Sequence, residues 1–434
     1  MPTTVGQGAR PGQAFFLDRN RETNHRRPHR RQPVRLIMAG HDVLMVTLPP
    51  FEGGVPAKTR ILCNHLAALG HRVTVAWYAT FAHHSQANAA CWQILAGRHP
   101  TTVSATAFDH FSGYAVGSWL PELEAPYYLL SHRWQDLIDR HDRHIAVGGS
   151  PMVGHILAQA GVPHFLWCAS DVMADRRDRQ SHMPWPRSMV DALVTRPWLR
   201  RQQRFILRHS PLVLGVSRYT TAQMLRQGAR ADRTDRLPIP VDPRYFTPAT
   251  AAPSADIIGF AARFEDPRKN LPLLLDAMAL LRRRRPHAKL HLAGCDPSPA
   301  TLARVSALGL TACIHFAGAV PAGQLADFYR SLDVFALPSW QEGLCLAGLE
   351  AMACGVPVVS TDCGGPADFV RTDISGILVK DWRADSLAQA LDRALTNRAA
   401  LSAGARALVV SEFSPSAFAN GIATAWNRVW KEAP

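Results

Sequence analysis

The alternation of short apolar runs with longer segments of helical period is the feature that most constrains the fold. "D-V-L-M-V-T-L" is followed by a helical segment over 57–69, which ends at Gly70, and then by "R-V-T-V-A-W". Strands that alternate with helices form parallel sheets, and such strands are almost wholly apolar because helices cover both faces. We therefore expect an α/β fold built on doubly wound sheets.

The same pattern restarts in the middle of the chain. From Ile257 onward, the runs that read as strands are "I-I-G-F-A", "K-L-H-L-A", "C-I-H-F-A", "V-F-A-L-P", "V-P-V-V-S" and "G-I-L-V". A proline-rich stretch without any period, 237–254, separates the two halves. A chain of 434 residues also suits two domains of about 200 residues better than one core. The prediction is two Rossmann-like domains that face each other across a cleft.

We divide the chain into five parts on this basis. They are a basic tail over 1–37, an N-terminal Rossmann-like domain over 38–240, a linker over 241–254, a C-terminal Rossmann-like domain over 255–414, and a C-terminal helix over 415–434 that we expect to cross back to the N-terminal domain. The tail contains eight arginines and two acids and has no apolar period, which indicates disorder. Met38 stands just before the first strand, so a later natural start stays open.

Cysteine usage and hydropathy indicate the cellular compartment of the protein. The eight cysteines form no C-x-x-C pair, and most of them lie in apolar runs, where thiols act as small buried hydrophobic groups. This pattern favours a reducing cytoplasm over a disulfide framework or a zinc site. No apolar stretch approaches the roughly 18 residues of a membrane span. We expect a cytoplasmic protein.

The motifs of several enzyme classes are missing from the sequence. G-x-G-x-x-G follows none of the candidate strands, which argues against a nicotinamide enzyme. The stretch "G-G-V-P-A-K-T" lacks the Walker spacing of a phosphate loop, and G-x-S-x-G is absent. Neither H-E-x-x-H nor D-x-D occurs, so we expect no metal site and no cofactor.

Two glutamates interrupt the apolar stretch "S-W-Q-E-G-L-C-L-A-G-L-E-A-M-A-C-G-V-P". They are Glu342 and Glu350, and carboxylates are rarely buried unless something pairs with them. A helix is expected from near Gly343 to about Cys354. If Glu342 precedes this helix, the free amides at its start form an anion site suited to a diphosphate, and the two acids can accept hydrogen bonds from sugar and ribose hydroxyls. Spacing alone leaves open that Glu342 is a surface acid and Glu350 a paired core carboxylate.

A second segment places two basic side chains at the same edge of the sheet. "G-F-A-A-R-F-E-D-P-R-K-N" follows the first strand of the second half and contains Arg263 and Lys269. Ligands of a parallel sheet gather at the carboxyl ends of its strands, so both cations should lie beside Glu342. Two cations next to a helix N-terminus suit a diphosphate, although each one alone could equally be a solvated surface cation.

Together these motifs resemble the retaining nucleotide-sugar glycosyltransferases of family four, which have the two-domain GT-B fold. "E-G-L-C-L-A-G-L-E" resembles their E-x7-E signature, and "A-R-F-E-D-P-R-K-N" resembles the segment that supplies their Arg and Lys. "P-P-F-E-G-G" with "L-A-A-L-G-H-R-V-T-V" is similar to their glycine-rich first loop and second strand. The resemblance covers 257–379, including Gly364-Gly365-Pro366, and 42–75.

The resemblance implies a role for each matching residue. Arg263 and Lys269 would hold the diphosphate and stabilise the leaving group without a metal, Glu342 would contact the donor sugar, and Glu350 the ribose. The other donor-binding groups would be the amides of Gly343, Leu344 and Cys345, together with Gly53 and Gly54. The implied reaction transfers a sugar from a nucleotide-diphosphate donor to a glycan or lipid-linked acceptor, with retention, in polysaccharide or glycoconjugate synthesis. The resemblance also implies that the domain over 38–240 binds the acceptor and the domain over 255–414 the nucleotide-sugar donor.

One part of the N-terminal half departs from the family pattern. Family members often carry a histidine next to an acid after a middle strand, whereas this chain reads "W-C-A-S-D", ending at Asp171. Asp171 is therefore our candidate on the acceptor side, while His155 and His164 are expected to be packing or surface histidines. This departure leaves open a catalytically silent GT-B protein that binds a nucleotide sugar or serves as a partner subunit.

The excess of basic residues predicts an interaction surface. The net charge is +14, and the segment over 196–209, "R-P-W-L-R-R-Q-Q-R-F-I-L-R-H", interleaves arginine with apolar residues at helical spacing. Such a helix could lie on an anionic membrane surface, or it could pack one face and leave a basic face in water. Without interleaved aromatic residues or a known module in the tail, we expect no nucleic-acid partner.

Overall fold

The computed structural model describes residues 40–49, 51, 53–80, 83–173, 185–250 and 255–434. These residues form one compact unit. The prediction of a disordered tail over 1–37 falls outside the described residues, as does the end of the linker.

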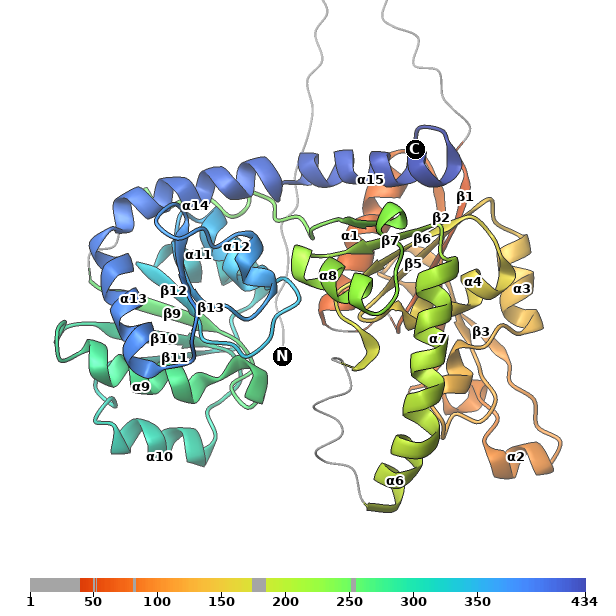
Figure 1. Ribbon diagram of the computed structural model, residues 1–434, viewed down its shortest axis with the longest axis horizontal. Coiled ribbons are helices and arrows are strands. Elements are labelled where there is room, and N and C mark those ends of the chain that lie inside the picture. Colours follow the sequence, from red (N-terminus) through yellow and green to blue (C-terminus); the bar gives the residue numbers. More distant parts are fainter. Residues whose placement is uncertain (1–39, 50, 52, 81–82, 174–184, 251–254) are drawn as a thin grey trace, which may run out of the picture. The chain divides into compact units, whose positions relative to one another are not determined.

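The N-terminal half contains an eight-stranded sheet (Figure 1). Its strands are β1 (Asp42–Thr47), β2 (Arg72–Tyr78), β3 (Thr102–Ala107), β4 (Phe111–Val116), β5 (Arg143–Gly148), β6 (His164–Cys168), β7 (Leu212–Gly215) and β8 (Thr234–Arg236). They are arranged in the order β3-β4-β2-β1-β5-β6-β7-β8. Because β2 lies on one side of β1 and β5 on the other, the chain changes direction across the sheet between β1 and β5.

The edge of this sheet departs from the prediction of purely parallel strands. β3 and β4 are antiparallel, and three residues join them, of which Phe108 and Asp109 have positive φ. A turn this tight can connect only antiparallel neighbours, since a parallel pair needs a long crossover. The sequence reasoning missed both strands because β3, "T-V-S-A-T-A", is an exposed edge strand without an apolar run.

Helices cover both faces of the N-terminal sheet. They are α1 (Gly54–Ala68), α3 (His132–Asp139), α4 (His155–Ala160), α7 (Arg196–His209) and α8 (Arg218–Arg226). The short helices α2 (Cys91–Leu95) and α6 (Trp185–Val190) lie beyond one end of the sheet, and a π-helical segment, η4 (Asp191–Thr195), joins α6 to α7 (Figure 1). Val43 and Met45 of β1 share a core with α1, whereas Leu44 and Val46 share a core with α3, α4 and α7. Successive strand residues point to opposite faces, so an unbroken apolar strand needs both helical layers.

The C-terminal half contains a six-stranded, wholly parallel sheet. Its strands are β9 (Ile257–Ala261), β10 (Lys289–Ala293), β11 (Ile314–Gly318), β12 (Val334–Leu337), β13 (Val358–Thr361) and β14 (Gly376–Val379), in the order β11-β10-β9-β12-β13-β14. The helices are α9 (Leu271–Leu281), α10 (Pro299–Ala307), α11 (Leu325–Arg330), α12 (Leu346–Ala353), α13 (Ala384–Thr396) and α14 (Arg398–Glu412). The predicted doubly wound α/β architecture is confirmed in both halves.

The last helix, α15 (Pro415–Trp430), packs against the N-terminal sheet (Figure 1). Phe418 lies 5.5 Å from Trp167 of β6, and the buried Trp426 stacks on His71 at 4.9 Å between ring centroids. Beyond the helix, Glu432 accepts hydrogen bonds from the Arg143 guanidinium. Aromatic burial of this kind is worth several kcal/mol in order of magnitude, so the end of the chain stabilises the first sheet.

Candidate functional site

In the C-terminal sheet, the switch point between β9 and β12 brings two loops together. Such a switch point is where α/β sheets bind ligands. The Asn270 side chain, after β9, donates to the Pro338 carbonyl at 3.2 Å, and the Trp340 amide donates to the Arg268 carbonyl at 2.7 Å. Segments from two strands therefore form one surface, which we call the donor loop pair (262–270 and 338–345).

Lys269 and Glu342 form the centre of the donor loop pair. The ammonium of Lys269 lies 2.6 Å from Oε1 of Glu342, and Ser339 donates its hydroxyl to the same oxygen at 2.9 Å. The two charged side chains are 24% and 10% exposed. Burial is the largest single effect and opposes the charge of Lys269, but the Glu342 carboxylate together with neighbouring groups such as Asp266 outweighs it and raises the pKa of Lys269. The predicted neighbours are thus a charged, partly buried pair.

Arg263 lies at the start of the 262–270 loop, at the opposite end from Lys269. Its guanidinium is 78% exposed and lies 3.2 Å from the carboxylate of Asp266. Asp266 also accepts from the Arg268 guanidinium at 2.8 Å, and this hydrogen bond holds the pKa of Asp266 below its usual range. One carboxylate therefore orients two arginines beside Lys269.

The loop that precedes α12 differs from the predicted helix start. The helix begins at Leu346, three residues later than expected, because Cys345 has a left-handed backbone (φ 78°) that the helix cannot include. Within the described chain, the amides of 343–345 donate to no backbone carbonyl. A Cβ atom on Gly365 would lie 2.3 Å from the Gly343 carbonyl oxygen, so only glycine allows this loop to pack so closely.

Glu350 lies within α12 and has a partner in the protein. The Tyr329 hydroxyl donates to its Oε2 at 2.8 Å. Burial raises the pKa of Glu350, and the tyrosine bond opposes that shift. The sequence left open that Glu350 is a paired core carboxylate, and this holds for one of its oxygens, Oε2. A ligand would have to bind the other oxygen, Oε1.

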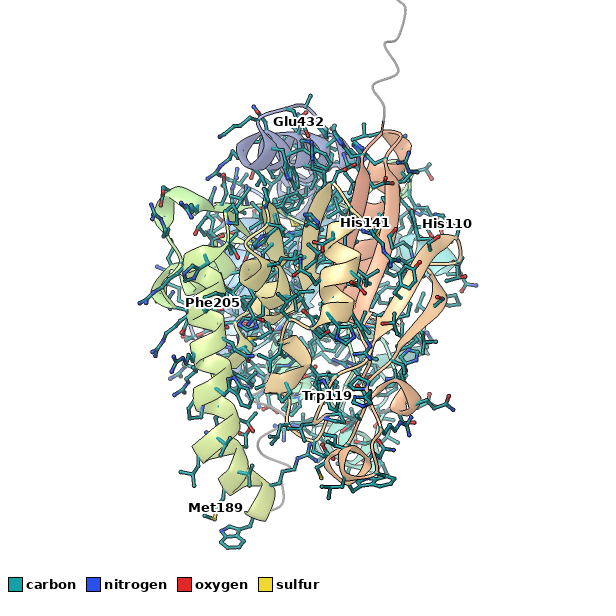
Figure 2. The ribbon with its side chains drawn as sticks, turned by 90° about the vertical axis from the view of Figure 1, so that its right-hand side faces the viewer. His110, Trp119, His141, Met189, Phe205 and Glu432 are labelled. Atoms are coloured by element: carbon teal, nitrogen blue, oxygen red, sulfur yellow. The ribbon has the colours of Figure 1, made fainter. Side chains whose placement is uncertain are left out.

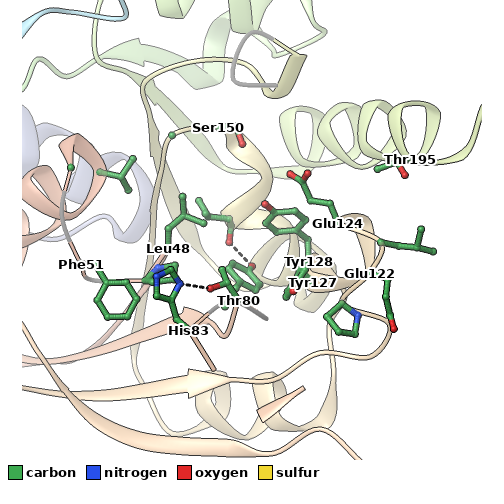
Figure 3. A pocket seen from close by; sticks show the side chains of 18 of the residues that line it. Leu48, Phe51, Thr80, His83, Glu122, Glu124, Tyr127, Tyr128, Ser150 and Thr195 are labelled. Carbon is green, nitrogen blue, oxygen red and sulfur yellow. Dashed lines mark hydrogen bonds between the residues drawn. The ribbon is translucent and has the colours of Figure 1, made fainter. Parts of the chain in front are cut away.

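In the N-terminal sheet, the switch point between β1 and β5 borders a cavity of about 1280 Å³. Its walls come from the segment after β1, from Gly149 and Ser150 after β5, from 121–128, and from 187–195. Figure 3 shows Glu122, Glu124, Tyr127 and Tyr128 on one wall and Phe51 and His83 on the other. The cavity is therefore lined by aromatic and aliphatic side chains, with carboxylates, a few hydroxyls and one arginine, Arg187.

Gly53 and Gly54 line this cavity at the start of α1. Gly53 caps the helix with φ 120°, a conformation that other residues rarely adopt. A Cβ atom on either glycine would meet no atom within 4 Å. Both glycines therefore border open space, in the cavity and not in the donor loop pair.

Lys58 is a residue that the sequence reasoning missed. It lies one turn into α1, its side chain is buried, and its ammonium donates to the carbonyls of Gly148 at 2.8 Å and Trp167 at 3.1 Å. The ammonium also lies 5.0 Å from the centre of the Trp167 ring. Burial lowers the pKa of Lys58 to about 7. The signal in the sequence was a lysine four residues before the buried Leu62, on the apolar face of a helix.

The remaining N-terminal candidates are buried after or beside β6. Asp171 accepts a hydrogen bond from the Met173 amide at 2.7 Å. His155 bonds the Tyr128 carbonyl through Nδ1 at 2.6 Å, and His164 lies 3.0 Å from the Ser210 hydroxyl through Nε2. Burial lowers the pKa of both histidines, that of His164 to about 4. The packing interpretation is confirmed for both histidines.

Within the described residues, no three His, Cys, Asp or Glu side chains are grouped so that they could hold a metal ion. None of the described helices is both long and apolar enough to cross a membrane.

Comparison with known proteins identifies the C-terminal half. Residues 255–397 match the model of a family described as glycosyl transferases group 1. The chain carries a group 1 glycosyltransferase domain. That domain contains Arg263, Lys269, Glu342 and Glu350, so the resemblance predicted from these motifs is confirmed at the level of the family.

Relatives match different lengths of the chain. A D-inositol 3-phosphate glycosyltransferase of Jonesia denitrificans is 37% identical over 166 residues, which are 36% of this chain and 39% of that protein. The chain thus matches less than half the length of this relative. A GDP-mannose-dependent alpha-(1-6)-phosphatidylinositol monomannoside mannosyltransferase of Mycolicibacterium smegmatis is 27% identical over 376 residues, 80% of this chain and 88% of that one.

A solved structure extends the likeness to both halves. Sucrose-phosphate synthase from Thermosynechococcus elongatus superimposes with a TM-score of 0.68 at 20% identity, covering 90% of this chain and 99% of that one. At this identity the likeness concerns the fold alone. The chain has the GT-B fold, as the sequence predicted.

Proposed function

We propose that the protein is a retaining glycosyltransferase that moves a sugar from a nucleotide-diphosphate donor to a glycan or lipid-linked acceptor, without a metal. The observation that carries the proposal is the Lys269–Glu342 pair at the switch point of a group 1 glycosyltransferase domain. The mannosyltransferase relative is GDP-mannose-dependent by name, which supports a sugar nucleotide as donor. The expected pathway class is polysaccharide or glycoconjugate synthesis.

The donor loop pair supplies the groups that a sugar nucleotide needs. The Lys269 ammonium and the exposed Arg263 guanidinium would neutralise the charge that develops on the diphosphate, where fixed charges contribute most to catalysis. The amides of Gly343, Leu344 and Cys345 would donate to phosphate oxygens, as backbone amides before a helix commonly do. Glu342 would accept from sugar hydroxyls, and Oε1 of Glu350 from the ribose.

The proposed reaction follows from this placement. The bond between the anomeric carbon and the diphosphate oxygen breaks, and its electron pair stays on the diphosphate. The acceptor hydroxyl then bonds the anomeric carbon from the same face, and its proton passes to the departing diphosphate oxygen. The charges of Lys269 and Arg263 favour this leaving group without a metal ion.

The N-terminal cavity is the proposed place of the acceptor. Aromatic side chains such as Tyr127 and Tyr128 present flat apolar faces, and Glu122 presents a carboxylate that accepts hydrogen bonds from hydroxyls. Gly53 and Gly54 border this space, and Asp171 stays the predicted acceptor-side acid. All eight cysteines are free thiols, five of them buried, and we propose the cytoplasm as the compartment.

A transfer assay tests the proposal. The purified full chain is screened against UDP-, GDP-, ADP- and dTDP-sugars by thermal shift, and the donor that stabilises it is then incubated with glycan and lipid-linked acceptors in EDTA. We expect transfer in EDTA and a product that keeps the donor's anomeric configuration by NMR. Glu342→Gln should lose transfer, whereas Asp136→Asn, at an exposed position of α3 outside both the donor loop pair and the cavity, should keep it.

Three results would contradict parts of this proposal. Donor binding without turnover on any acceptor would favour the catalytically silent GT-B protein, which the altered "W-C-A-S-D" motif keeps open. Activity that returns only with a divalent cation would exclude the metal-independent reaction. An inverted product would exclude retention while leaving the donor site in place.

A further inference from the structure

The segment formed by α6, η4 and the start of α7 exposes an unusual number of apolar side chains. Trp185 is 75% exposed and Leu193 is 71% exposed. The others in this group are Met189, Val190 and Val194. Five neighbouring apolar residues in water form the kind of patch that marks an interaction site in a folded protein.

The second half of the same segment is strongly basic. One face of α7 is buried through Leu199, Ile206 and Leu207. The opposite face exposes Arg200, Arg201, Arg204 and Arg208, which surround a shallow depression of about 610 Å³. The one acid of 185–209, Asp191, is bonded to Arg196 and so does not offset these four charges.

A second apolar patch lies at the same end of the N-terminal sheet. Leu95 and Trp92 of α2 are 91% and 66% exposed, and Trp119 is 37% exposed. In Figure 1, α2 and α6 lie at the same end, and Figure 2, turned by a right angle, places Trp119 and Met189 toward that end. The walls of the N-terminal cavity come from the segments next to these patches, 121–128 and 187–195.

We infer that this end of the N-terminal half docks on an anionic lipid bilayer, with its apolar side chains in the interface and the α7 arginines against lipid phosphates. Tryptophan is enriched at membrane interfaces, and a helix with apolar and arginine-rich parts suits a charged lipid surface. Against a nucleic acid, the arginines would have a role but Leu95, Met189 and Leu193 would have none. This inference deepens the proposed function, because it selects the lipid-linked class of acceptor.

The test measures flotation of the full chain with vesicles. One set contains equal parts of phosphatidylglycerol and phosphatidylcholine, and the other contains phosphatidylcholine alone. We expect binding to the anionic set at low salt, weak binding to the neutral set, and partial release at about 0.5 M salt, where charges are strongly screened. The basic tail is present in every variant, so its contribution is constant.

Matched variants separate this surface from the general basic charge. Arg200→Gln with Arg204→Gln should lower partitioning by about 30-fold, from the known contribution of each arginine near an anionic surface. Arg283→Gln with Arg284→Gln removes the same charge from exposed positions after α9 and should change partitioning less than about 3-fold. Leu193→Ser should lower partitioning by about tenfold, whereas Leu302→Ser, on exposed α10, should not.

The inference is overturned if the two arginine pairs have equal effects, or if the full chain does not float with anionic vesicles at low salt. Binding to single-stranded RNA that is lost with Arg200 and Arg204, in the absence of vesicle binding, would assign the surface to nucleic acid instead. Flotation involves no sugar transfer. Vesicle binding without transfer would therefore count against the proposed function alone, and transfer without vesicle binding against this inference alone.

Discussion

Replacing Lys58 by methionine should remove a pH dependence that is built into the N-terminal half. Lys58 lies in α1 with its ammonium bonded to two main-chain carbonyls, of Gly148 and Trp167, and no carboxylate is bonded to it in the described structure. Burial lowers its pKa to about 7, from a usual value of 10.5. Methionine keeps the length of the apolar stem but carries no proton to lose.

The sign and size of the effect follow from the difference between the folded and unfolded pKa. Between these two values the unfolded chain holds the proton on Lys58 and the folded chain does not, so the free energy of unfolding rises with pH in that window. Between about pH 6 and pH 8.5, this one group should raise the free energy of unfolding of the wild-type protein by about 2 kcal/mol. The methionine variant should lack that gain.

The assay is urea unfolding followed by tryptophan fluorescence at several pH values and constant ionic strength. The quantity of interest is the wild-type free energy of unfolding minus that of Lys58→Met, because other titrating groups then cancel. Lys380→Met, at an exposed position, serves as the control for the loss of a lysine charge outside the core. A flat or falling difference for Lys58 would refute the assignment of a buried, easily deprotonated lysine.

Four further outcomes are expected from single substitutions. Lys269→Ala should lower kcat/KM for the donor by about 100-fold with unchanged circular dichroism, since a fixed charge on the leaving group is lost. Glu350→Gln, which can still accept from the tyrosine beside it, should raise the donor KM about tenfold at unchanged melting temperature. Cys345→Gly should raise the free energy of unfolding by about 1 kcal/mol, because glycine fits the left-handed backbone at φ 78°. Gly53→Ala should lower it by about 1 kcal/mol in the same urea assay, whereas Gly54→Ala, at a helix start with ordinary φ, should not.

The apolar runs determined most of what the sequence could predict about the fold. β9, β10 and β14 coincide with the quoted runs residue for residue, because strands covered on both faces are mostly apolar. The exposed edge strand β3 and its partner β4 gave no such signal. Their pairing depends on a tight turn in which two residues have positive φ. The residue types in that turn did not predict this conformation.

The candidate site was predictable where loop spacing follows from topology. Lys269 and Glu342 meet because their strands are neighbours at a switch point, and the motif spacing already implied that arrangement. The start of α12 was not predictable, because the left-handed conformation of Cys345 is a property of the packed loop and not of cysteine. The cavity was missed for a related reason, since its walls combine segments such as 121–128 and 187–195 that carry no motif.

The two sheets use the same geometry for different chemistry. At the switch point of the C-terminal sheet, the loops carry Lys269 and Arg263, and cations there favour the ligand that brings negative charge, a diphosphate. At the switch point of the N-terminal sheet, the walls carry aromatic rings and the carboxylates of Glu122, Glu124 and Asp191 against one arginine, Arg187, which favours a partner without negative charge. The proposed transfer would need this division, because a strongly cationic acceptor cavity would compete for the diphosphate. Under the proposed function, the charges at the ends of equivalent strands would decide which half holds which substrate.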